Sequence, residues 1–241
     1  MSLQITPLQK EKHAHTKINI ATPFAFAQDQ HILPVVAHEF VRIGAELPIV
    51  FIKDSASERF DVVVMLGLKT GENLMVADGK WQGFYVPKVL WNHPLILADD
   101  PSLEGQLLVA LVESSPMVNT ETGHALFNED GTESDFLKSR VDSMKEFFIQ
   151  SQATRGFSNA LAEMDLLIPQ TLTIKLEGHP REISGIYIVD EKKLNSLSDE
   201  QLLDLNKRGM MPAIYAHLMS LQQVQRLGDR VNKATAAATA A

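Results

Sequence analysis

The chain has 241 residues, 45% of them hydrophobic, which is enough to bury a sizeable core as one large domain or as a domain with a smaller appended unit. Its 22 basic and 30 acidic residues give a formal net charge of -8, so we expect no nucleic-acid partner. The absence of cysteine excludes disulfides, thiolate catalysis and cysteine-ligated metal centres.

The first 20 residues are polar and mixed in charge, and they predict a mobile or edge-strand arm. His13 and His15 would share one face of an extended segment, where a surface metal site is conceivable but a plain arm is favoured. This region lacks the apolar core of about 7–15 residues that a secretory signal needs, and no run reaches the ~18 apolar residues of a membrane span. We therefore expect a soluble, cytoplasmic protein without membrane insertion.

Short apolar runs follow between Phe24 and Leu68. The runs LPIVFIKD and FDVVVMLGL are rich in Val and Ile and bounded by turn residues, so they predict strands. The preceding run repeats its apolar residues at helical spacing, with Pro34 suited to a first turn and Gly44 to a C-terminal stop. It predicts a short helix over residues 34–43.

Aromatic residues gather in the segment 81–93, which has the sequence WQGFYVPKVLWNH and follows an Asp78-Gly79 pair typical of a hairpin turn. Amphipathic aromatic side chains near Gly and Pro are typical of a platform that binds a peptide or protein. An alternative is a packed aromatic corner with both tryptophans in the core. The binding residues predicted for the platform are Trp81, Phe84, Tyr85, Trp91 and His93, with Tyr215 as a further exposed candidate.

The loop that follows two more predicted strands, LILADD and QLLVALVESS, partly mimics a calcium loop. When Gly131 is aligned with the sixth position of such a loop, the first and twelfth positions fall on Leu126 and Leu137, which cannot bind calcium. We expect no metal here and no cofactor elsewhere. Thr132 and Asp135 instead have the spacing of a capping box that starts a helix.

That helix is predicted to be long. Apolar residues recur at intervals of three and four from Phe136 to Met164, which predicts one helix over about 134–167, before Pro169. Gly156 is a weak point, where a kink, a close helix crossing or a division into two helices is expected.

A hairpin and two capped helices complete the predicted fold. The runs TLTIKLEG and REISGIYIVD are predicted to pair around a Gly-His-Pro turn. Ser198 and Gln201 then form a capping-box pair, Gly209 ends that helix, and Pro212 suits the first turn of the next. His217 lies on the apolar stripe of this last helix, and residues 231–241 are low in complexity and predicted to be disordered.

The recognisable nucleotide, hydrolase-elbow and zincin motifs are absent. An enzyme of unrecognised type would have to use His38 with Glu39, or His93 or His217, as acid–base groups. Adjacent helical residues point about 100° apart, so His38 and Glu39 are poorly placed to bond each other. His217 is expected to be a buried histidine that is hydrogen-bonded to the sheet or to a neighbouring helix.

Several short motifs resemble the SapC family of bacterial proteins, over about Phe24 to Leu227. They are Phe51-Ile52-Lys53-Asp54, Leu66-Gly67-Leu68, Gly71-Glu72-Asn73-Leu74, Trp81-Gln82-Gly83-Phe84-Tyr85-Val86-Pro87, Leu126-Phe127, Asp130-Gly131, Gly185-Ile186-Tyr187, Asp190-Glu191, Leu194 and Tyr215-Ala216-His217-Leu218. The resemblance implies an association with surface layers, and with flavin-dependent halogenases and TonB-dependent receptors, near which members are often encoded. It implies no catalytic residues.

The sequence thus predicts one α+β domain over residues 21–230. We expect a curved antiparallel sheet from residues 45–112 and 170–189, with a long central helix and a C-terminal helix pair packed against it. We expect a cytoplasmic accessory protein that binds a protein or peptide partner. The sequence is also compatible with a homodimer of this chain. The alternatives are an enzyme of unrecognised type and a structural surface-layer component.

Overall fold

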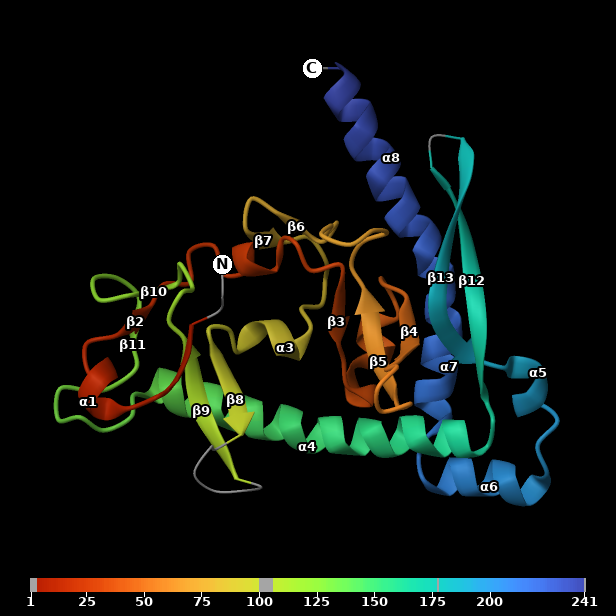
Figure 1. The fold of residues 1–241 in the computed structure, drawn as a ribbon, viewed down its shortest axis with the longest axis horizontal. Helices are drawn as coiled ribbons and strands as arrows, with labels where there is room; N and C mark the ends of the chain where they lie inside the picture. Colours follow the sequence, from red (N-terminus) through yellow and green to blue (C-terminus); the bar gives the residue numbers. More distant parts are fainter. Residues whose placement is uncertain (1–3, 100–105, 177, 241) are drawn as a thin grey trace. The chain divides into compact units, whose positions relative to one another are not determined.

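The computed structural model describes residues 4–99, 106–176 and 178–240, and its contacts divide the chain into two compact units. Unit 1 consists of Met1–Ala27, Val76–Trp81 and Lys88–Ile149, and unit 2 of Gln28–Met75, Gln82–Pro87 and Gln150–Ala241. Figure 1 shows the helices and strands of both units. The α+β class is confirmed, with antiparallel sheets, a long helix and a C-terminal helix pair.

Unit 1 contains three small antiparallel sheets. The first has the order β1 (Ile5–Pro7), β9 (Leu107–Val112) and β8 (Leu95–Asp99), and the second places β2 (Lys17–Ile18) between β10 (Val118–Asn119) and β11 (His124–Ala125). The third is the hairpin of β6 (Val76–Ala77) and β7 (Lys80–Trp81). Short helical turns are α1 (Lys10–His13), η1 (Ala25–Ala27) and α3 (Lys88–Trp91).

Local turn chemistry explains the β6–β7 hairpin, and strand pairing explains the position of β1. Asp78 and Gly79 both have positive φ, 50° and 70°, as the predicted two-residue turn requires. The N-terminal residues form β1 and β2, and β1 is an edge strand in which Ile5 pairs with Val112 of β9. The core of unit 1 consists of Ile18, Leu95, Leu111, Met117, Leu126, Leu137 and Met144.

Helix α4 (Asp135–Glu163) begins where predicted, but with a different cap, and it ends before the predicted residue 167, which is already the first residue of a strand. The Ser134 hydroxyl accepts a hydrogen bond from the Leu137 N–H at 3.2 Å, whereas the Thr132 hydroxyl donates to Asp130 at 2.6 Å. The predicted Thr132 cap is therefore wrong. The helix is continuous through Gly156, where an added Cβ atom would meet no other atom within 4 Å, so the expected close crossing is also wrong.

Unit 2 is built on a five-stranded antiparallel sheet, in the order β12 (Leu167–Leu176), β13 (His179–Val189), β4 (Ile49–Lys53), β5 (Phe60–Met65) and β3 (Ile32–Pro34). Strand β4 is central and its first three residues are fully buried, which explains a continuous apolar run in place of alternation. The strands 95–112 belong to the β1–β9–β8 sheet, so the single sheet expected from 45–112 is wrong. Both edges of β4 are already occupied, by β13 and β5.

The run 34–43 does not form the single helix that was predicted. Strand β3 ends at Pro34, and the turn η2 (Ala37–Glu39) then leads into the single helical turn α2 (Phe40–Ile43). Because β3 pairs with β5, with Pro34 opposite Val63, the first part of the run belongs to the sheet.

The C-terminal helices are α5 (Glu191–Leu194), α6 (Asp199–Lys207), α7 (Met211–Ser220), the turn η3 (Leu221–Gln223) and α8 (Val224–Ala240). The capping box of Ser198 and Gln201, the positive φ of Gly209 and the Pro in the first turn of α7 are all confirmed. Helix α8 includes residues 231–240, for which low complexity predicts disorder. Alanine has the highest intrinsic helix propensity, which favours a helix in this sequence.

Candidate functional site

The loop 82–87 of unit 2 is bonded to the turn that follows α2. One carboxylate oxygen of Glu46 accepts the backbone N–H of Phe84 at 2.9 Å and that of Tyr85 at 3.4 Å, and the other accepts the Phe84 N–H at 3.1 Å. A carboxylate that accepts backbone N–H groups makes charge-assisted hydrogen bonds, which restrain the loop. The Phe84 side chain is 96% exposed, so this restrained backbone presents an aromatic ring to solvent.

Tyr85 attaches the same loop to the start of α2. Its hydroxyl donates to the Oε1 atom of Glu39 at 2.9 Å, and the Arg42 guanidinium lies 5.5 Å from the centre of its ring. Burial, followed by the negative charge of Glu39, raises the pKa of Tyr85 to about 12, so the hydroxyl stays protonated as a donor. Glu39 also accepts the N–H of Val36 at 3.4 Å and is 1% exposed. These bonds give Glu39 a structural role.

Arg42 and Glu46 are site residues that the sequence did not predict. Glu39, Arg42 and Glu46 are spaced at i, i+3 and i+7, which is typical of one helical face, although in the structure they lie in η2, in α2 and in the turn after α2. That spacing was the available signal, but it does not reveal which loop the face contacts.

The tryptophans of the aromatic segment 81–93 lie in unit 1, where both contact Phe24. The ring centres of Trp81 and Trp91 lie 6.2 Å and 5.7 Å from that of Phe24, in edge-to-face geometry. The indole N–H of Trp81 is buried without a hydrogen-bond partner in the described chain, whereas Trp91 is 44% exposed. The segment is thus divided between the units, with Phe84 and Tyr85 in unit 2.

His93 is also packed within unit 1. Its ring stacks on Phe26, with centres 3.6 Å apart, and its Nε2 atom lies 2.9 Å from the Ser115 hydroxyl. Burial lowers the pKa of His93 to about 4, so the ring is neutral at pH 7. His93 and Trp91 line a small pocket of about 70 Å³ together with Arg140, whose guanidinium lies 5.9 Å from the Trp91 ring centre.

The three acid–base candidates of unit 2 lie in different environments. His38 is exposed, and its ring has no hydrogen bond or ion pair with any residue that the structure describes, whereas Glu39 is buried against Tyr85. His217 is fully buried between the backbones of β4 and β13, with Nδ1 2.8 Å from the Ile49 carbonyl and Nε2 3.1 Å from the Val189 N–H. The expected hydrogen-bonded, buried His217 is confirmed. Tyr215 is 43% exposed on α7.

Within the described residues, no three His, Asp or Glu side chains are grouped closely enough to hold a metal ion. No helix in the described ranges is both long and apolar enough to cross a membrane.

The model of the SapC family matches residues 8–227, which is most of the chain. Searches of curated proteins and of solved structures gave no match.

Proposed function

Since the chain belongs to the SapC family, we propose that it is an accessory protein that binds a protein or peptide partner through the loop 82–87. The observation that carries the proposal is the 96% exposure of Phe84 on a backbone bonded to Glu46. Aromatic residues dominate the binding energy of many interfaces, and a restrained loop loses less entropy when its partner binds. Phe84 is therefore the proposed anchor, inserted into an apolar pocket of the partner.

Glu46 and Tyr85 are positioning residues in this proposal. Glu46 restrains the backbone on either side of the Phe84–Tyr85 peptide, and Tyr85 fixes the loop to the buried Glu39. Neither needs to touch the partner. Their variants should weaken binding by loosening the loop, and they should do so less than removal of the Phe84 ring.

The partner is proposed to belong to a surface-layer, TonB-dependent receptor or flavin-dependent halogenase system of the same cell, with the cytoplasm as the place of binding. The direct test is calorimetric titration of the purified full chain with the purified surface-layer protein, with the receptor and with the halogenase. We expect one of them to bind. Failure of all three to bind would contradict this choice of partner.

Substitution of Phe84 by Ala tests the loop itself. Because this ring is almost fully exposed, Phe84→Ala should leave the thermal midpoint unchanged while weakening binding about tenfold or more, as for an interface anchor. Leu203→Ala is the matched control, since Leu203 is also an exposed apolar residue of unit 2, at 51%, but lies on α6. Equal affinity of Phe84→Ala and wild type would refute a role for the loop.

A further inference from the structure

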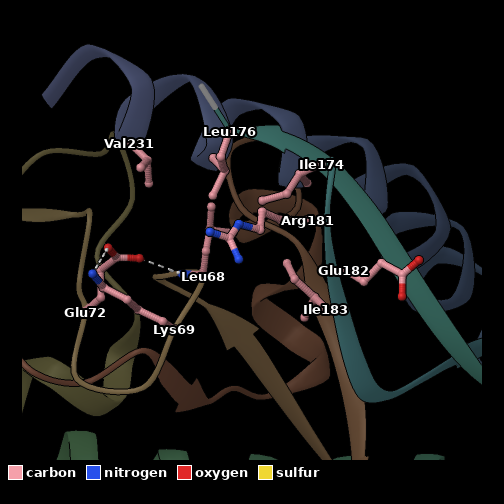
Figure 2. A pocket seen from close by; sticks show the side chains of 9 residues that line it. All are labelled: Leu68, Lys69, Glu72, Ile174, Leu176, Arg181, Glu182, Ile183 and Val231. Atoms are coloured by element: carbon pink, nitrogen blue, oxygen red, sulfur yellow. Dashed lines mark hydrogen bonds and ion pairs between the residues drawn. The ribbon is translucent and has the colours of Figure 1, made fainter. Parts of the chain in front are cut away.

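Unit 2 contains a cavity of about 400 Å³ beside the part of the β12–β13 hairpin that is nearest to its turn (Figure 2). Its walls come from this hairpin, from Val231 of α8 and from the loop that carries Leu68 and Glu72. The volume lies within the range of roughly 300–1,000 Å³ that is typical of ligand pockets. None of the residues proposed above as the binding loop lines it.

A β-bulge and the strand register determine which side chains face the cavity. The pairing shifts where Thr171 lies opposite two residues of β13, and Gly185 there has a φ of +79°. Beyond the bulge, Arg181 is directly opposite Ile174. Because side chains alternate along a strand, Arg181 and Ile183 share one face, and Glu182 is on the other.

Arg181 therefore introduces a positive charge into an otherwise apolar face. In Figure 2 its side chain extends across the cavity toward the loop that carries Leu68 and Glu72, while Glu182 points away from it. Arg181 forms no ion pair and no side-chain hydrogen bond with any residue in the described part of the chain. It is exposed, so a ligand can reach the guanidinium from solvent.

The opposite wall does not supply the missing negative charge. One carboxylate oxygen of Glu72 accepts the N–H of Leu68 at 2.9 Å, and the other lies 3.6 Å from the Lys69 ammonium. Glu72 is thus occupied by its own loop, and Lys69 already has a counter-ion. The charge that remains uncompensated inside the cavity is the single positive charge of Arg181.

We propose that this cavity binds the monoanion of an aliphatic carboxylic acid, a medium-chain fatty acid. Arg181 binds the carboxylate, and the hydrocarbon chain lies along Ile174, Leu176 and Ile183. A planar guanidinium matches a carboxylate through two parallel hydrogen bonds. The aliphatic side chains of the walls remove the hydrocarbon from water, which favours binding of the chain.

The charges of the lining favour a monoanion over a dianionic phosphate. Glu182 points away from the cavity, and the other three charged lining residues, Lys69, Glu72 and Arg181, carry a net charge of +1. One carboxylate adds a single negative charge, which the free guanidinium compensates. A phosphate dianion would add a second negative charge near Glu72 without a cation to balance it.

Calorimetric titration of the full chain with decanoate tests the proposal. Wild-type protein should bind one decanoate, and Arg181→Gln should weaken binding about tenfold or more, because a hydrogen bond to a charged group is lost. Arg59→Gln is the matched control, since Arg59 is exposed in the same unit but does not line the cavity. Decanol, which has the chain without the charge, should bind about as weakly as decanoate binds to Arg181→Gln.

The hydrophobic part is tested by Ile183→Ser, which should weaken decanoate binding but leave the far-ultraviolet circular dichroism unchanged. No binding of decanoate to wild type, or equal binding to Arg181→Gln, would overturn the proposal. Tighter binding of a short peptide that ends in a leucine carboxylate would also overturn it and assign the cavity to a peptide C-terminus.

Discussion

The Nδ1 atom of His217 lies 2.8 Å from the carbonyl oxygen of Ile49, and its Nε2 atom accepts the N–H of Val189. The pairing of Tyr187 with Phe51 places Val189 opposite Ile49 in the same ladder. The imidazole therefore stands where a direct hydrogen bond between β13 and β4 would otherwise form. A carbonyl can only accept and an N–H can only donate, so Nδ1 carries the proton. Ser220 accepts the N–H of Ile49 at 2.9 Å, which completes the link from α7 to β4.

Substitution of His217 tests this bridge. His217→Ala would leave the Val189 N–H and the Ile49 carbonyl unpaired beside a cavity, so we expect a loss of about 3–5 kcal/mol in the free energy of unfolding of unit 2. His217→Gln, whose amide can both donate and accept, should lose less than His217→Ala. Urea unfolding of wild type and of both variants measures the difference. Equal stability of wild type and His217→Ala would contradict the bridge.

The same histidine predicts a pH dependence. Burial lowers the pKa of His217 to about 4, against about 6.5 in the unfolded chain, so the unfolded state binds more protons between these values. The contribution of neutral His217 to the free energy of unfolding is complete above pH 6.5. It is lost as the pH falls toward 4, and the total loss is about 3 kcal/mol. The imidazolium would present a second N–H to the Val189 N–H, which is the physical reason for the loss.

Comparison with His217→Gln isolates this effect from other titrations. The pKa of Glu113 is lowered to about 2 by its bonds to Lys12, His13 and Thr6, so its contribution is lost only below its ordinary pKa of 4.5. His93 titrates in the same range as His217 but lies in unit 1. The stability of wild type should fall more steeply than that of His217→Gln from pH 6.5 to 4.5. Parallel curves would contradict the assignment.

Two glycine-to-alanine substitutions should have opposite effects. At Gly156, inside α4, a new Cβ would meet no atom within 4 Å, so Gly156→Ala should stabilise the protein by about 0.5–1 kcal/mol through helix propensity. At Gly44, a Cβ would lie 3.0 Å from the Ala216 carbonyl oxygen and 3.2 Å from the Ser220 Cβ. Gly44→Ala should therefore push α2 away from α7 and lower the free energy of unfolding by about 1–3 kcal/mol. Thermal unfolding of both variants provides the comparison.

Tyr85→Phe removes a donor from a buried carboxylate. Glu39 is 1% exposed, so loss of the Tyr85 hydroxyl should cost about 1–3 kcal/mol in unfolding free energy. Tyr215→Phe is the control, because Tyr215 is 43% exposed and its variant should stay within about 0.5 kcal/mol of wild type. Similar losses in the two variants would argue against the Glu39 bond.

Short-range sequence signals were sufficient to predict several local elements. The Asp78-Gly79 turn, the β12–β13 hairpin and the capping box of Ser198 depend on residues a few positions apart, and all three are confirmed. The predicted Gly-His-Pro turn of the hairpin is wrong, because His179 and Pro180 pair with β12 as the first residues of β13. Two further local predictions were wrong because two local structures compete for the same residues. Ser134 caps α4 in place of Thr132, and the residues up to Pro34 pair with β5 as a strand and do not join the helix.

Which strands share a sheet, and which side chains meet, depends on the folded chain. The apolar patterns of β8 and β4 are both compatible with a central sheet, yet β8 joins β9 in unit 1 because the partners of β4 are β13 and β5. Glu46 and Phe84 are 38 residues apart, and His217 and Ile49 are 168 apart. Hydrophobic periodicity specifies a face but no partner, so contacts at such separations follow from strand register and from packing in three dimensions.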